Sequence, residues 1–217
     1  MQLLEVRNLS KTYDGVVALR NINLVIEKSE VVGIYGPNGS GKSTLLKIVS
    51  GFEKPTCGTV IFEGRDITNE KPYKIARMGI LYSFQIPRLF TNLSVLDNLS
   101  LGLIRELGKF KAYEESLKIL SELDLENLAS KKAGELSQGE MKLLEVLKVL
   151  ISKPKLLLLD EPFASLDSEN VKKMLKILLK QRYTMVITAH RMKILKRIAS
   201  RCLEIREGKI AKYEKIR

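Results

Sequence analysis

The sequence predicts an α/β protein with a mostly parallel sheet, an antiparallel β part at the N-terminus and an inserted helical segment. Two observations support this prediction. A glycine-rich loop at 36–44 lies between a short apolar strand and an apolar-spaced helix. The four leucines at 156–159 do not alternate with polar residues, which is typical of a strand buried on both faces of a parallel sheet. We expect a single domain over 1–217, with 1–85 and 155–217 as its core and 86–154 as a helical subdomain.

The composition is that of a globular protein, with 45% hydrophobic and 29% charged residues among 217. The apolar runs are too short to cross a bilayer, and the start of the chain lacks the pattern of a signal peptide, so we expect a cytoplasmic protein. Cys57 and Cys202 lie far apart without metal-ligand spacing, which predicts reduced, structural cysteines.

The net charge is +12, and residues 191–217 hold ten Lys or Arg against three Asp or Glu. Such a surface suits nucleic acid or an anionic membrane leaflet. A solvated lysine-rich face is the alternative, and we favour it.

The N-terminal residues predict antiparallel strands, because apolar and polar residues alternate at 3–6 and 22–26 on either side of a turn at Asp14-Gly15. Tyr13 stands just before this turn. An aromatic ring upstream of a phosphate loop suits stacking on adenine, whereas a half-exposed strand tyrosine is the alternative, and the spacing alone favours neither.

The loop at 36–44 matches the phosphate-binding pattern G-x-x-x-x-G-K-[ST]. Its glycines let backbone N–H groups turn toward a phosphate chain, and the helix N-terminus adds partial positive charge. In this pattern Lys42 reaches the β- and γ-phosphates and the Ser43 hydroxyl binds Mg²⁺. A glycine turn that matches by chance is the alternative, which the flanking strand and helix disfavour. The loop residues predicted to bind nucleotide are Gly36, Pro37, Asn38, Gly39, Ser40, Gly41, Lys42, Ser43 and Thr44.

Beyond the loop, 58–62 predicts a strand, 72–78 a short helix with Pro at its first turn, and 79–84 a buried strand. This strand ends at Gln85, because Pro87 cannot continue a central strand. An amide at that carboxyl end is suited to holding a water or a metal-bound water. Residues 94–124 predict helix throughout, which is the basis of the helical subdomain.

A second helix start follows at 136–140, where Ser137-x-x-Glu140 predicts a capping box before an apolar helix. The same helix start, with an exposed hydroxyl and Gly139 allowing close approach, is also suited to gripping a phosphate. The motif alone leaves both interpretations open.

Two acids, Asp160 and Glu161, stand at the end of the leucine strand. Adjacent buried carboxylates are costly unless a cation compensates them. We therefore expect Asp160 to hold Mg²⁺ through its water shell and Glu161 to accept a proton from an attacking water. A strand ending in solvated acids is the alternative.

The last third of the chain predicts a helix at 168–180, a strand at 184–188 and a closing hairpin turned at Glu207-Gly208. The strand leads to His190, the only histidine. A lone histidine is usually structural, but at the end of a core strand a neutral imidazole would reach the γ-phosphate.

Together these motifs resemble those of the ATP-binding cassette (ABC) ATPases over nearly the whole chain. The likeness is greatest to importers of the branched-chain amino-acid type, through 75–80, 84–90 and 139–143. Gln138 and Glu140 depart from the signature L-S-G-G-Q, whereas Ser137 and Gly139 remain, so phosphate contact is expected to survive. The resembling segments are 36–44 (Walker A), 156–160 (Walker B), Glu161 (catalytic glutamate), Gln85 (Q-loop), 136–140 (signature), 165–167 (D-loop), His190 (H-loop) and Tyr13 (adenine stacking).

The resemblance implies a P-loop NTPase core of the RecA-like kind and a dimer in which two cassettes sandwich two ATP molecules. Since the chain has one set of motifs, it is expected to pair with a copy of itself or with a related ATPase. Transmembrane permease subunits, and indirectly an external solute-binding protein, are further implied partners, on the inner face of the cell membrane. The implied roles are catalysis by Glu161, His190, Lys42 and Gln85, nucleotide contact by Tyr13, Ser137, Gly139 and Asp167 beside the loop, and Mg²⁺ binding by Ser43, Gln85 and Asp160.

Two functions agree with this resemblance. One is the ATP-hydrolysing subunit of an importer of amino acids or another small polar solute. The other is a soluble ABC ATPase without transport, either an assembly factor or a nucleic-acid clamp. Paired cassettes and long coiled-coil insertions would favour the clamp, and the sequence has neither, so nucleic acid is not expected as a partner. A generic P-loop kinase would leave 137–140 and His190 unexplained.

Overall fold

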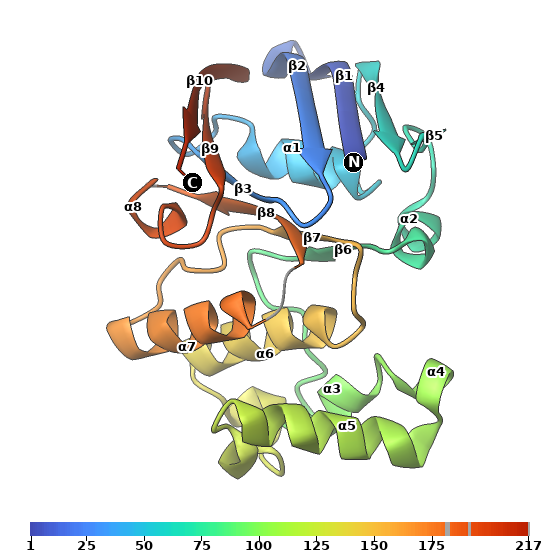
Figure 1. Cartoon of the computed structure of the whole chain (residues 1–217), viewed down its shortest axis with the longest axis vertical. Coiled ribbons are helices and arrows are strands. Elements are labelled where there is room, and N and C mark those ends of the chain that lie inside the picture. Colours follow the sequence, from blue (N-terminus) through green and yellow to red (C-terminus); the bar gives the residue numbers. More distant parts are fainter. Residues whose placement is uncertain (181–182, 191, 217) are drawn as a thin grey trace. The chain divides into compact units, whose positions relative to one another are not determined.

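The computed structural model describes residues 1–180, 183–190 and 192–216, which form two compact units (Figure 1). The first unit comprises Met1–Tyr82, Lys155–Glu161 and Arg182–Arg217, and the second comprises Ser83–Pro154 and Pro162–Gln181. The sequence placed all of 155–217 in the core. The structure groups Pro162–Gln181 with the helices, because α7 packs against α6.

The smaller sheet of the first unit is antiparallel, with strand order β2-β1-β4-β5. β1 and β2 pair on either side of the turn at Asp14-Gly15, as the alternation predicted. One face of this pair is buried through Leu4, Leu9 and Leu19, which are almost fully covered. The strands are β1 (Gln2–Tyr13), β2 (Val16–Glu27), β4 (Cys57–Phe62) and β5 (Arg65–Asp66).

The larger sheet has six strands in the order β10-β9-β3-β8-β7-β6. β9, β3, β8 and β7 run parallel, and β10 pairs antiparallel with β9 as the predicted closing hairpin. All four leucines of β7 are buried, so the loops after β3, β7 and β8 leave the same edge of an apolar sheet. Its strands are β3 (Val31–Tyr35), β6 (Ile80–Ser83), β7 (Leu156–Leu159), β8 (Thr184–Ala189), β9 (Arg201–Arg206) and β10 (Lys209–Lys215). The helices of this unit are α1 (Lys42–Val49), α2 (Pro72–Met78) and α8 (Met192–Leu195).

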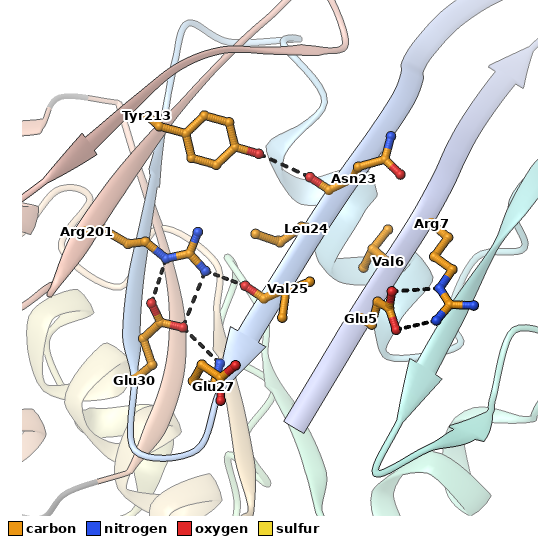
Figure 2. A pocket seen from close by; sticks show the side chains of 10 residues that line it. All are labelled: Glu5, Val6, Arg7, Asn23, Leu24, Val25, Glu27, Glu30, Arg201 and Tyr213. Atoms are coloured by element: carbon orange, nitrogen blue, oxygen red, sulfur yellow. Dashed lines mark hydrogen bonds and ion pairs between the residues drawn. The ribbon is translucent and has the colours of Figure 1, made fainter. Parts of the chain in front are cut away.

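Side chains from the larger sheet cover the free edge of β2, beside a groove of about 500 Å³ (Figure 2). The Arg201 guanidinium donates to the carbonyl of Val25 and pairs with Glu30, 2.6 Å away. The Tyr213 hydroxyl donates to the carbonyl of Asn23 at 3.1 Å. An edge strand presents unpaired backbone groups, so these side chains replace a backbone ladder between the two sheets.

The second unit is helical, with α3 (Val95–Ser100), α4 (Ile104–Leu107), α5 (Lys109–Glu122), α6 (Gln138–Leu150) and α7 (Ser168–Leu179). The stretch 94–124, predicted to be helical throughout, is helical without an intervening strand, but the structure divides it into three helices. Gly102 lies in the turn after α3, and Gly108 adopts φ +76° between α4 and α5. Glycine disfavours helix and adopts positive φ readily, so the two glycines account for the breaks.

Candidate functional site

The glycine loop, which precedes α1, packs tightly against strands β9 and β2. A Cβ at Gly36 would lie 2.1 Å from the carbonyl oxygen of Ile205, and one at Gly41, where φ is +105°, would lie 2.5 Å from that of Ala18. A side chain at Gly39 would meet open space. The loop is therefore fixed on its inner side and open at its tip, directly before a helix N-terminus that favours anions.

Two polar groups are buried inside this loop. The Lys42 side chain is 4% exposed, and its ammonium donates to the carbonyls of Gly36 and Pro37 at 2.8 and 2.9 Å. Ser40 Oγ is the one buried side-chain polar atom without a hydrogen-bond partner in the described part of the chain. Buried hydroxyls normally have a partner, so an orphan hydroxyl beside a buried ammonium fits a bound phosphate.

The Asp160 carboxylate follows β7 and is held by three hydroxyl groups. Ser43 and Thr188 donate to its Oδ1 at 3.0 and 2.8 Å, and Tyr82 donates to its Oδ2 at 2.9 Å. Asp160 is 2% exposed. Tyr82 and Thr188 did not emerge from the sequence as site residues, although each is a polar residue near the carboxyl end of an apolar strand.

Oxygen ligands are what Mg²⁺ prefers, and it usually takes one or two carboxylates and completes its shell with phosphates and water. The donor set of Ser43 Oγ and Asp160 fits this chemistry. The described residues contain no cluster of three or more His, Cys, Asp or Glu that would form an all-protein metal cage.

Glu161 lies between two basic groups. Its Oε1 is 3.7 Å from Lys42 Nζ, and its Oε2 is 2.9 Å from His190 Nε2. Glu161 is buried and has φ +50°, a conformation that costs energy in a residue with a Cβ. The Thr188 hydroxyl accepts the backbone N–H of Glu161 at 2.8 Å and helps to hold it. The structure thus brings Lys42, Glu161 and His190 together, and their role at a phosphate stays a prediction.

Tyr13 lies at the end of β1 and is 38% exposed. The Lys11 ammonium is 4.6 Å from the centroid of its ring, which is cation–π geometry. Burial raises the pKa of the Tyr13 phenol, with a contribution from Glu53, while the Thr44 hydroxyl lowers it. Contact with Thr44 places Tyr13 beside the glycine loop, and stacking on adenine stays a prediction.

In the second unit, Ser137 begins α6 with a capping box. The Glu140 N–H donates to Ser137 Oγ at 3.2 Å, and the Ser137 N–H donates to Glu140 Oε2 at 2.8 Å. This backbone N–H is the main reason why the pKa of Glu140 is lowered. The structural interpretation of the motif is therefore confirmed, and the phosphate role of Ser137 stays a prediction.

Asn170 joins the starts of α6 and α7. Its backbone N–H and its Nδ2 both donate to the Asp167 carboxylate at 2.8 Å, which caps α7. A Cβ at Gly139 would lie 2.5 Å from Asn170 Nδ2. Asn170 was missed by sequence reasoning, because no local pattern places it against Gly139. Gln85 also belongs to the second unit, so its role at a nucleotide and those of Gly139 and Asp167 stay predictions.

A phosphate loop before α1 and a buried acidic pair after β7 define a P-loop nucleotide-binding protein. Comparison with known proteins narrows the class, since the family model described as "ABC transporter" matches residues 19–164. The matched span contains the loop, Gln85, Ser137 and both acids. The chain belongs to the ABC transporter family of ATP-binding proteins.

Its similarity to members of this family extends along almost the whole chain. It is 37% identical over 211 residues to the probable branched-chain amino acid transport ATP-binding protein LivG of Archaeoglobus fulgidus, covering 90% of this chain and 82% of the relative. It is 36% identical to the spermidine/putrescine import ATP-binding protein PotA of Mesoplasma florum, covering 96% of this chain and 60% of the relative. A dimeric ATP-binding cassette in a post-hydrolysis state, bound to ADP and Pi, matches with TM-score 0.89 and 29% identity over 99% of both chains.

The chain is therefore the ATP-binding subunit of an ABC transporter and an ATPase that converts ATP to ADP and phosphate. Cassettes of this family form dimers. No helix within the described residues is long and apolar enough to span a membrane.

Proposed function

We propose that this chain powers an importer of amino acids or another small polar solute, bound to transmembrane permease subunits at the inner face of the cell membrane. The observation that supports its catalytic part is the position of Glu161, buried between Lys42 and His190. The cargo class rests on the similar proteins, which are named for branched-chain amino acids and for spermidine and putrescine.

In this proposal the loop N–H groups, Ser40 Oγ and the Lys42 ammonium bind the phosphate chain. Mg²⁺, held by Ser43 and Asp160, would neutralise charge on the phosphates. Thr188 and Tyr82 keep the Asp160 carboxylate oriented by donating to it.

The chemical step needs a base for the attacking water. The Glu161 carboxylate takes that proton, and His190, whose Nε2 lies 2.9 Å from it, orients the carboxylate and contacts the γ-phosphate. Burial of Glu161 keeps bulk water from competing for this carboxylate.

Each site is completed by a second cassette, either a copy of this chain or a related ATPase. Ser137 and Gly139 of one cassette would grip the γ-phosphate bound by the other, with Asp167 beside them, and Gln85 would help to hold Mg²⁺ through water. ATP then joins the halves and hydrolysis releases them, which is a two-state cycle that a permease can use. An external solute-binding protein would deliver the cargo.

Membrane fractionation tests the transport part of this proposal. The chain is expected to sediment with membranes from cells that contain its permease subunits and to stay in the supernatant when those subunits are deleted. Retention in the supernatant in both cases would instead favour an ABC ATPase without transport, such as an assembly factor.

A further inference from the structure

Loop 84–88, which carries Gln85, is tied to α6 at both ends. Lys142 Nζ donates to the carbonyl of Gln85, and Glu145 Oε2 accepts the backbone N–H of Arg88 at 3.3 Å. Lys148 Nζ donates to the carbonyl of Arg88 and pairs with Glu145 at 3.0 Å. We call Lys142, Glu145 and Lys148 the α6 clamp.

The spacing of the clamp explains how one helix holds the whole loop. Residues three apart on an α-helix are neighbours, so Lys142, Glu145 and Lys148 follow one another in a polar stripe along α6. Within the loop, the Arg88 guanidinium lies 4.1 Å from the centroid of the Phe84 ring, which closes the loop on itself.

Burial shows that the clamp is more than a solvated surface. Lys142 is 7% exposed and Glu145 is 2% exposed, whereas lysine and glutamate are almost never so buried unless they are paired. Buried charges lower stability unless hydrogen bonds compensate them, and their best-attested use is to fix one arrangement over others. Here the compensating groups include backbone atoms of the loop, so the arrangement that is fixed is that of the loop on α6.

The clamp connects two segments of the chain that each adjoin a proposed part of the ATP site. Lys142 is in the helix that Ser137 caps. Tyr82, which donates to the Asp160 carboxylate, precedes Gln85 by three residues. Only two residues of the chain therefore separate Tyr82, a hydrogen-bond donor to the acid proposed to hold Mg²⁺, from Gln85 in the loop that the clamp holds.

We propose that Lys142 and Glu145 are positioning residues for ATP hydrolysis, which hold the backbone around Gln85 on the helix that begins at Ser137. Gln85 and Ser137 then move together when a second cassette closes on the nucleotide. This inference rests on the roles proposed above for Gln85 and Ser137.

Steady-state ATPase kinetics of the full chain test the inference with Lys142→Met and Glu145→Met, which keep side-chain bulk but remove the polar contact. A mutation far from the reacting atoms can still displace a catalytic group slightly, and such a displacement lowers the rate by up to about 100-fold. We expect a kcat loss of that order, with Kd for ATP within about twofold of wild type, because the phosphate loop is unaltered. Lys142→Arg restores the donor and is expected to recover most of kcat. Lys118→Met, on the exposed face of α5, is the matched control without effect.

Hydrogen exchange separates positioning from general destabilisation. The Arg88 amide is expected to lose protection in Glu145→Met while the amides of α6 keep theirs. A kcat within about twofold of wild type for both Met variants would overturn the inference, as would equal losses of protection throughout α6. An inactive wild type would contradict the proposed ATPase site itself, whereas an active wild type with active Met variants would contradict the clamp alone.

Discussion

At the scale of single residues, the geometry of Glu161 is the most informative feature. Glu161 has a positive φ, which residues with a Cβ rarely adopt, and this backbone conformation directs its buried carboxylate toward Lys42 and His190. Strain of this kind persists only where surrounding contacts enforce it and is common at functional sites. Thr188 supplies one such contact through the Glu161 N–H.

Replacing this carboxylate by an amide separates binding from chemistry. Glu161→Gln is expected to keep ATP affinity, because the loop and Lys42 remain, and to lose at least about 100-fold in kcat, the usual contribution of a general base. Phosphate release and titration with a fluorescent ATP analogue measure the two quantities. Glu169→Gln, at the exposed start of α7, is the matched control. Normal hydrolysis by Glu161→Gln would remove Glu161 as the base.

The capping carboxylate of α6 makes stability depend on pH. The pKa of Glu140 is lowered from its ordinary 4.5, so its charged form stabilises the fold above that value, and this contribution disappears as the pH falls through the lowered pKa. The free energy of unfolding of wild type is expected to exceed that of Glu140→Gln by roughly 0.3–1 kcal/mol at neutral pH. This difference is expected to vanish in acid. Urea unfolding of both proteins at neutral pH and in acid below the lowered pKa of Glu140 measures it. A difference that grows in acid would contradict the assigned cap.

At the scale of elements, the covered edge of β2 is the feature that the sequence did not reveal. Arg201 satisfies the carbonyl of Val25 and the Glu30 carboxylate together, whereas Tyr213 contributes one neutral hydrogen bond at an exposed position. Arg201→Met is therefore expected to cost about 1–3 kcal/mol of unfolding free energy, and Tyr213→Phe about 0.5–1.5 kcal/mol. Denaturant unfolding measures the loss of unfolding free energy in each variant, and hydrogen exchange of the β2 amides reports the loss of protection at this edge. A larger effect of Tyr213→Phe would contradict this account of the edge.

Most elements could be predicted because their signals are local. The glycine loop and the proline at the start of α2 each restrict the backbone locally. The unbroken leucines of β7 indicate a strand that is buried on both faces. The breaks within 94–124 were missed because its apolar spacing suggested helix throughout, although Gly102 and Gly108 were visible in the sequence.

The missed contacts at the site are tertiary. Tyr82, Thr188 and Asn170 act through residues far away in sequence, and Lys142 and Glu145 look like ordinary surface positions of an apolar helix. The contact partners of these residues can be identified only once the three-dimensional positions of β6, β8, α6 and α7 are known. Sequence reasoning therefore identified the groups proposed to touch nucleotide and missed those that hold them.

At the scale of the whole molecule, one chain carries one phosphate loop and one capped signature helix. In the proposed function, both contribute to one site, where the signature helix of one cassette meets the nucleotide bound by the other. The proposed ATP site therefore requires a second cassette, and an importer requires permease subunits beside it.

The most direct measurement is a pull-down of the tagged chain from its own membranes in mild detergent, with the co-purifying chains identified and counted by mass spectrometry. For the proposed importer, we expect multi-spanning membrane subunits together with two cassettes, either two copies of this chain or one copy and a related ATPase. Recovery of soluble partners alone, or of nucleic acid, would contradict the transport function and leave only the ATPase chemistry.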